Sequence, residues 1–144
     1  MNIKNYTTEV SAVRSIGEIE LILSQFGASA IMKEFLSDGK CSSLSFKLNG
    51  KSYKIPINQE GVMKVLYKNN RRSPRVNEMR SREERAYNVS WRVIKDWVHS
   101  QLSIVFLGQA QPDEVLLPYM FDGKRTFYQA YKDGRIQIEK KDDD

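Results

Sequence analysis

The sequence predicts an α+β fold, in which a small, hairpin-centred antiparallel sheet of three to five strands packs on a long amphipathic helix and two or three shorter helices. Two observations predict it. Alternating apolar and polar residues flank Asn49-Gly50, which is typical of a β-hairpin closed by a type I′ turn. Further along the chain, an apolar row with helical spacing extends from Tyr87 to Val105.

Length and cysteine content indicate the number of domains and the kind of cellular compartment. The 144 residues suit one domain over 1–144, long enough to bury a core. The single cysteine, Cys41, excludes an intramolecular disulfide and fits a reducing compartment. The N-terminus lacks an apolar stretch of signal-peptide length, and no apolar run reaches the ~18–20 residues of a membrane span. We therefore expect a cytoplasmic protein that does not associate with membranes.

The N-terminal part predicts an edge strand followed by a helix. Asn5 to Val10 is short and β-prone. Ser15-Ile16-Gly17-Glu18 has the spacing of a capping box, which predicts a helix start at Ser15. Four apolar residues then share one helical face: Ile16, Ile19, Leu23 and Phe26. Gly27 is expected to end the helix, because glycine adopts positive φ without a steric penalty.

The hairpin is preceded by a further predicted strand, Ala28 to Ser37, which turns at Asp38-Gly39. The hairpin strands carry apolar residues at alternate positions: Leu44, Phe46 and Leu48, then Tyr53, Ile55 and Ile57. Lys47 and Lys54 occupy the other face, and Lys51 lies near the turn. Lysines on an exposed strand face are usually there for solvation and edge protection.

A short helix and a linker follow the hairpin. Asn58 is positioned to cap a helix from Gln59 to about Lys68. Its expected inward residues are Val62, Val65, Leu66 and Met63. The segment 69–80 contains Ser73-Pro74 and little apolar content, which predicts an exposed, flexible, basic linker.

The long helix is expected to start at a second capping box, Ser81-Arg82-Glu83-Glu84, and to end at Gly108. Its apolar row is Tyr87, Trp91, Ile94, Val98, Leu102 and Val105, widened by Ala86, Val93, Trp97 and Ile104. Trp91 and Trp97 lie about 240° apart around the helix, so they should face different partners. The opposite row, expected in solvent, is Arg85, Asn88, Arg92, Lys95 and His99.

The C-terminal part predicts short elements. Pro112-Asp113-Glu114 is typical of a helix first turn, and the apolar residues from Val115 to Phe121 should pack against the long helix. Turns are expected at Asp122-Gly123 and Asp133-Gly134. Between and after them we expect an aromatic cluster of Phe127, Tyr128 and Tyr131, a last strand from Arg135 to Glu139 and a frayed charged tail, 140–144.

Basic residues are concentrated in one window. The chain has 23 Lys and Arg against 18 Asp and Glu, a net charge of +5. The window from Lys64 to Arg85 holds eight basic and three acidic residues, so its excess equals that of the whole chain. Six of the eight are arginines, which favours bidentate contacts with phosphate or carboxylate groups. A polyanion or an acidic protein surface is the expected partner.

Catalytic chemistry has little support in the residue types. One histidine and one cysteine, far apart in sequence, cannot supply the usual zinc ligands. A hydrolase built on Cys41 would need His99 as its base, and the two fall on different predicted elements. The chain has neither a P-loop nor a dinucleotide-binding glycine motif. We therefore expect a protein without enzymatic activity and without a metal or other cofactor.

Phosphate contacts by Arg and Lys gain affinity through counterion release, so the basic window predicts nucleic-acid binding. The linker, the basic helix row and the lysines of the hairpin are expected to make one surface. No named nucleic-acid motif is present, so sequence specificity is not predicted. The candidate binding residues are Arg71, Arg72, Arg75, Arg80, Arg82, Arg85, Arg92 and Lys95.

Several segments together resemble a family of small uncharacterised proteins from bacteriophages, prophages and mobile elements. They are YTTEV, SIGEIELIL, QFGASAIMKEF, WRVIKDWVHSQLSIV, LLPYM and FDGKRTFYQAY, between Tyr6 and Tyr131. The resemblance implies a phage-type accessory protein acting in the cytoplasm of a host bacterial cell. Such proteins commonly serve DNA metabolism or inhibit host defence. The resemblance supplies no functional residues.

Two functions are consistent with these observations. The first is a non-enzymatic accessory protein that binds nucleic acid through the arginines. The alternative is a phage-encoded inhibitor of a host defence system, an anti-CRISPR or similar anti-defence protein, that binds a nucleic-acid-handling protein. A variant that sequesters a cyclic nucleotide signal would need a pocket, which Arg125 with Tyr119, Phe127 and Tyr128 would supply. The C-terminal aromatics are also compatible with a homodimer surface.

Overall fold

The protein, seen in a computed structural model, is described for residues 3, 5, 8–70, 72–137 and 139. Its elements, in order, are α1 (Ala12–Gln25), β1 (Ala30–Phe35), β2 (Cys41–Leu48), β3 (Lys51–Pro56), α2 (Gln59–Leu66), α3 (Val76–Phe106), α4 (Pro112–Leu116), the 3₁₀ helix η1 (Leu117–Tyr119) and α5 (Phe127–Lys132). Within these residues one antiparallel sheet has the strand order β1-β2-β3. The predicted α+β class is confirmed.

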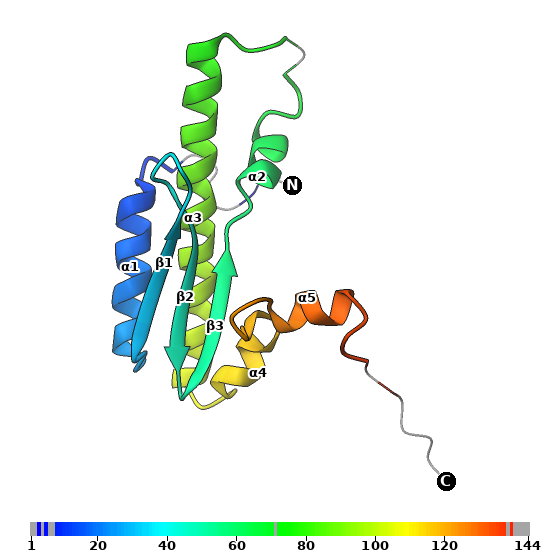
Figure 1. Ribbon diagram of the computed structural model, residues 1–144. Helices are drawn as coiled ribbons and strands as arrows, with labels where there is room; N and C mark the ends of the chain where they lie inside the picture. The colour runs from blue at the N-terminus through cyan, green and yellow to red at the C-terminus, as the bar shows by residue number, and fades with distance from the viewer. Residues whose placement is uncertain (1–2, 4, 6–7, 71, 138, 140–144) are drawn as a thin grey trace.

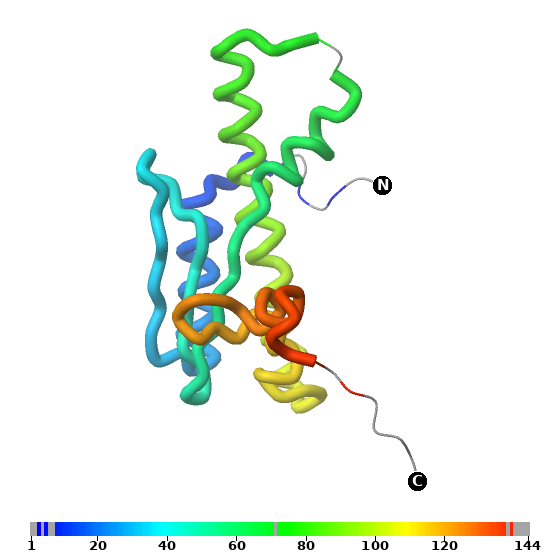
Figure 2. The backbone as a smooth tube through the Cα atoms, turned by 45° about the vertical axis from the view of Figure 1, so that its right-hand side comes forward, coloured from blue at the N-terminus to red at the C-terminus, as the bar shows by residue number. Residues whose placement is uncertain are grey.

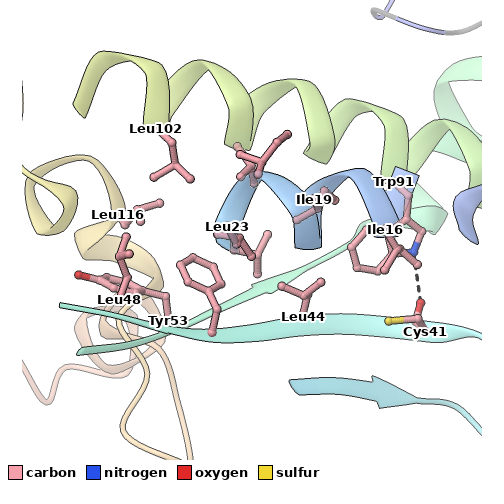
Figure 3. Close-up of a cluster of buried hydrophobic side chains, with 14 of the residues drawn as sticks. Ile16, Ile19, Leu23, Cys41, Leu44, Leu48, Tyr53, Trp91, Leu102 and Leu116 are labelled. Atoms are coloured by element: carbon pink, nitrogen blue, oxygen red, sulfur yellow. Dashed lines mark hydrogen bonds between the residues drawn. The ribbon is translucent and has the colours of Figure 1, made fainter. Parts of the chain in front are cut away.

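Helices α1 and α3 lie side by side over one face of the sheet (Figure 1). The core fills the space between these two layers (Figure 3). Its largest fully buried side chains include Trp91, Tyr53, Ile19, Leu23, Leu44 and Leu102. The apolar row predicted for the long helix therefore does face the core, with Tyr87, Trp91, Val98 and Leu102 buried.

The hairpin forms as predicted. Asn49 and Gly50 both have positive φ, at 51° and 75°, and Leu48 pairs with Lys51 across the two-residue loop. That combination defines a type I′ turn. The preceding strand β1 is shorter than predicted, and it pairs antiparallel with β2.

Two glycines give a matched test of these backbone assignments. Gly50→Ala forces a Cβ into left-handed backbone, so we expect it to lower the free energy of unfolding by about 1–2 kcal/mol. Gly17→Ala places its methyl group in open space on the exposed side of α1, so it should raise that free energy by about 0.5–1 kcal/mol. Urea denaturation of both variants measures the two shifts. If both substitutions shift the free energy of unfolding in the same direction, the assignment of the type I′ turn is contradicted.

Helix α1 begins earlier than predicted. Ser11, not Ser15, is its N-cap, and the Ser11 hydroxyl accepts from the Arg14 N–H at 3.2 Å. The Ala12 N–H donates to Asn88 Oδ1 on α3 at 2.9 Å, so a tertiary contact satisfies a donor that the helix itself cannot. Ser15 is consequently buried inside the helix. As predicted, the helix ends before Gly27, which has a φ of 91°.

The predicted N-terminal strand is wrong in the residues that the structure describes. Asn5 lies in a turn with a φ of 65°, and residues 8–10 have no regular structure. Tyr6 and Thr7 lie outside the described residues. The Asn5 side chain instead donates to Asp96 Oδ2 on α3 at 2.6 Å.

Helix α3 also begins earlier than predicted. Its first residue is Val76, its N-cap is Arg75, and Ser81 is an interior residue rather than a cap. Residues 76–80 are therefore helical, and only the segment before them connects α2 to α3. Helix α2 contacts α3 further along, at Arg82 and Glu83, so the helix extends above this contact and the capping signal at Ser81 does not set its start. Asn58 caps α2 as predicted, but Val65 is 41% exposed rather than inward.

The C-terminal predictions are partly wrong. Helix α4 begins at Pro112 and Gly123 turns the chain, as expected. Tyr128 and Tyr131 are exposed, so they do not form the expected cluster, because Thr126 caps a helix, α5, that carries them outward. Residues 135–137 and 139 are not a strand. Ile138 and the predicted tail, 140–144, lie outside the described residues.

Every helix in the described part of the chain is too short or too polar to cross a membrane.

Candidate nucleic-acid interface

The basic window forms a projecting unit, which we call the basic arm and define as residues 59–85. It comprises α2, the connecting loop and the first ten residues of α3. Figures 1 and 2 show that this end of α3 extends past the ends of the strands, with α2 and the loop beside it. Residue 71 within the loop, Arg71, lies outside the described residues, so its predicted role stays a prediction.

Contacts between α2 and α3 hold the arm together. The Arg82 guanidinium lies over the Tyr67 ring, 4.8 Å from its centroid. Gln59 Nε2 donates to the Glu83 carbonyl oxygen at 3.0 Å. A cation–π contact at a partly exposed site contributes about 0.5–1 kcal/mol. Arg82 therefore has a structural role in the arm, and one face of its guanidinium is covered.

Four of the predicted arginines are exposed on the arm: Arg72, Arg75, Arg80 and Arg85. Arg72 Nη2 lies 3.1 Å from Glu78 Oε1 in an ion pair whose side chains are 72% and 39% exposed. Such exposed pairs contribute little, so a phosphate can replace the carboxylate at small cost. Around the helix, Arg80 lies about 200° from Arg82, so the arm presents cations on more than one side.

Arg80 also lines a shallow cavity of about 420 Å³ at the base of the arm. Lys40, from the β1–β2 turn, lines the same cavity, and its Nζ lies 5.3 Å from the centroid of the Tyr87 ring. The carboxylates of Glu83 and Glu84 line it too. The mixed charges make this cavity a poor anion site, so we assign Arg80 to the surface of the arm.

Arg92 and Lys95 occupy a different environment from the one predicted. Their side chains are only 19% and 17% exposed, and both face Glu18 on α1. Arg92 Nη1 lies 2.5 Å from Glu18 Oε2, and Lys95 Nζ lies 3.8 Å from the same oxygen. The row expected in solvent is therefore, at these positions, the polar seam between α1 and α3. Their predicted binding role is untested, but each already has an acidic partner.

Burial opposes the ionisation of Glu18, but the hydrogen bond from Arg92 and the charges of Arg92 and Lys95 outweigh it and hold its pKa below the usual 4.5. A depressed pKa stabilises the fold above the unfolded-state pKa, and this stabilisation is lost as the pH falls through the folded-state pKa.

Glu18→Gln should therefore lower the free energy of unfolding at pH 7 by about 1 kcal/mol and have a smaller effect below pH 4. Glu60→Gln, which removes the exposed i,i+4 partner of Lys64, is the control and should change stability by at most about 0.5 kcal/mol. Urea denaturation at pH 7 and at a pH below 4 measures the loss of stability that Glu18→Gln causes at each pH. Equal losses at the two pH values would contradict the assigned ion pairs.

The lysines of the hairpin do not extend the arm. Lys51 lies beside the β2–β3 turn, at the opposite end of the sheet from the arm (Figure 1), and its Nζ pairs with Asp113 Oδ2 of α4 at 2.7 Å. Lys54 pairs with Glu34 across the outer face of the sheet. The single basic surface expected from the sequence is thus divided into separate groups by the fold.

The pocket predicted around Arg125 is also divided. Tyr119 packs edge-on against Trp97, with the ring centroids 5.1 Å apart. Phe127 lines one cavity with Arg125, whereas Tyr128 lines a different one with Arg125. Tyr119 lines neither. The four residues therefore do not share a pocket.

Catalytic groups remain scattered in the fold. Cys41 is 3% exposed, and burial raises the pKa of its thiol, which disfavours the nucleophilic thiolate. His99 is an exposed residue of α3. Among the described residues, no three His, Cys, Asp or Glu side chains are grouped so that they could hold a metal ion.

No protein-family model, curated protein or solved structure matches this chain. The resemblance to phage proteins rests on the sequence segments alone and stays a prediction.

The sequence placed Lys47 on the outer face of the hairpin, but it was not read as a site together with Ser43 and Ser45. Ser43 and Ser45 alternate with apolar residues on β2, and Lys47 continues the series. That period-2 spacing was the signal that these three side chains share the sheet face away from the helices. Phe121 joins them from the C-terminal part, a contact that sequence spacing could not indicate.

Proposed function

We propose that this protein binds nucleic acid without catalysis and that the basic arm supplies the phosphate contacts. One observation carries the proposal: four exposed arginines lie on an arm that projects beyond the sheet, within the window that holds the whole charge excess of the chain. A projecting element reaches into a groove or along a backbone more readily than a flat surface does.

The spacing of the arginines suits a polyphosphate backbone. Ten residues separate Arg75 from Arg85, which corresponds to about 15 Å along a helix. The axial rise of B-form DNA is about 3.4 Å per base pair, so this length corresponds to roughly four base pairs. Guanidinium groups bind phosphate oxygens in a bidentate manner, which favours arginine over lysine at such positions.

Sequence-independent contacts are the expected mode. At about 100° per residue, Arg75, Arg80 and Arg85 are successively about 140° apart around α3, so they do not converge on one base edge. Phosphate contacts position a protein on nucleic acid but carry no sequence information. We therefore expect similar affinities for unrelated sequences of the same strand type.

The test is a fluorescence-anisotropy titration of the full chain with duplex DNA, single-stranded DNA and duplex RNA at several salt concentrations. We expect binding at low salt, and the logarithm of the association constant should fall linearly with that of the salt concentration. Binding that is absent from all three nucleic acids at low salt would refute the proposal.

The alternative, a phage-encoded inhibitor that binds a host defence protein, is favoured by a different observation. Tyr128 and Tyr131 are 52% and 47% exposed, and their i,i+3 spacing places both rings on one face of α5. Exposed tyrosines are frequent anchors in protein–protein interfaces. Under this alternative, the arm would not bind nucleic acid, and substitutions on α5 would disrupt the function instead.

A further inference from the structure

The outer face of the sheet, which α1 and α3 leave uncovered, carries an ordered set of polar side chains. Strand pairing aligns them in rows across β1, β2 and β3. The rows are Ala30, Lys47 and Ser52; then Met32, Ser45 and Lys54; then Glu34, Ser43 and Pro56. Two serines and a lysine therefore follow one another along the central strand, which is the most protected position in the sheet.

The two central serines are buried but lack partners. Ser43 is 3% exposed and Ser45 is 7% exposed, although both lie on the face opposite the core. Neither hydroxyl oxygen has a hydrogen-bond partner among the described residues. Leaving a buried hydroxyl unsatisfied is unfavourable. Ser15 and Tyr53 also have hydroxyls without a partner in the described part of the chain, so what distinguishes Ser43 and Ser45 is their position on the outer face of the sheet.

An ion pair and an aromatic ring cover the serines. Lys54 Nζ reaches across β2 to Glu34 Oε1, 3.1 Å away. The same Nζ lies 5.0 Å from the centroid of the Phe121 ring. Phe121 is fixed at the edge of β3, because its N–H donates to the Ser52 carbonyl oxygen at 2.8 Å. Since Lys54 and Glu34 are 25% and 43% exposed, an anion can displace the carboxylate at modest cost.

Two adjoining cavities open beside this cover. One, of about 480 Å³, is lined by Met32, Ser45, Lys47 and Phe121. The other, of about 560 Å³, shares Lys47, Ser52 and Phe121 with it. Both volumes fall in the range of small-molecule sites. Figure 2 shows the loop that follows Met120 passing in front of the strands, which forms the outer wall.

Lys47 is the cation at the junction of the two cavities. It is exposed, and it makes no ion pair with any residue that the structure describes. The neighbouring carboxylate, Asp122, is occupied within its own turn, because Asp122 Oδ1 accepts from the N–H groups of Lys124 and Arg125 at 2.9 Å. An anion placed between the cavities would therefore meet a lysine without an ion-pair partner among the described residues, beside a carboxylate whose Oδ1 already accepts two backbone N–H groups.

We propose that this face is a binding site for a nucleoside monophosphate. The phosphate binds Lys47, the Ser45 hydroxyl bonds to the polar sugar, and the base packs between Phe121 and Met32. The three chemistries required of the ligand, an anionic end, a hydroxyl-bearing middle and a flat apolar end, match the three kinds of lining residue. The site is independent of the basic arm, which lies at the other end of the fold.

Isothermal titration of the full chain with AMP, inorganic phosphate and adenosine tests the proposal. We expect saturable one-to-one binding of AMP, tighter than either half. Lys47→Gln should weaken AMP binding about ten- to hundredfold, and Ser45→Ala about two- to tenfold. The controls, Lys64→Gln on α2 and the arm variant Arg72→Gln/Arg75→Gln/Arg80→Gln, should leave it unchanged.

Ser45→Ala separates a ligand role from a structural one. Because the hydroxyl has no partner in the free protein, its removal should raise the melting temperature while it weakens AMP binding. The proposal fails if none of the three probes binds, if phosphate or adenosine alone binds as tightly as AMP, or if Lys64→Gln weakens binding as much as Lys47→Gln does.

Discussion

Replacing Trp91 by alanine is expected to lower the free energy of unfolding by about 3–5 kcal/mol, because it leaves a large cavity in the core. Trp91 of α3 is 0% exposed, and its side chain lies between Ile16 of α1 and the start of β2 (Figure 3). Its Nε1–H donates to the Cys41 carbonyl oxygen at 3.3 Å, and the Tyr87 hydroxyl donates to the same oxygen at 3.0 Å.

The second tryptophan provides the matched control. Trp97 is only partly buried and packs edge-on against Tyr119 at the C-terminal end of the fold. Trp97→Ala should therefore cost about 1–2 kcal/mol, since less apolar area is removed from the interior. Urea denaturation monitored by far-ultraviolet circular dichroism measures both. A larger effect for Trp97→Ala than for Trp91→Ala would contradict the deeper burial of Trp91.

The environment of Trp91 shows what the sequence could and could not predict. The spacing of Tyr87, Trp91 and Val98 on one helical face was sufficient to place all three in the core. The partner of the Trp91 N–H was not predictable. It is the carbonyl oxygen of Cys41 at the start of β2, where the pairing with β1 is irregular and Phe35 aligns with Cys41 rather than with Ser42. Ser42 consequently has no paired residue on β1. The Cys41 carbonyl oxygen accepts hydrogen bonds from two side chains of α3.

The predicted ends of helices and strands were correct where local residues fix them and wrong where they do not. The Asn49-Gly50 turn is fixed by local backbone chemistry, so the sequence was sufficient to predict it. The start of α1 depends on a contact with a distant segment, Ala12 with Asn88, and α3 starts at Val76 with Arg75 as its N-cap, five residues before Ser81. A capping signal at Ser15 has no means of indicating that contact. Both helices begin before their predicted caps.

The candidate site follows the same logic. Charge density along the chain located the arm, because consecutive arginines stay close in any fold. It could not separate Arg92 and Lys95 from the arm, since their partner Glu18 is 74 residues away from Arg92 in sequence. Nor could it reveal the outer sheet face, where Phe121 meets Lys54. Residues that are close in sequence were predictable as a group, and residues brought together by packing were not.

The arm itself can be tested with a variant that removes three exposed charges and leaves the buried side chains intact. Arg72→Gln/Arg75→Gln/Arg80→Gln should weaken nucleic-acid binding about 10²–10³-fold near 0.1 M salt. The salt dependence should become shallower by about 0.9 for each phosphate that the variant no longer neutralises. Anisotropy titrations over a range of salt concentrations measure both quantities, and the free energy of unfolding should change by less than about 0.5 kcal/mol.

A control with the same reduction of net charge distinguishes local binding from overall attraction. Lys124→Gln/Lys132→Gln/Arg135→Gln removes three exposed cations from the C-terminal part, away from the arm. If the arm holds the phosphates, this control should lower affinity only slightly and leave the salt slope unchanged, because the slope depends on the phosphates neutralised rather than on distant charge. Equal reductions of affinity in the two triple variants would mean that the nucleic acid responds to the net charge of the protein, and the arm would then have no special role.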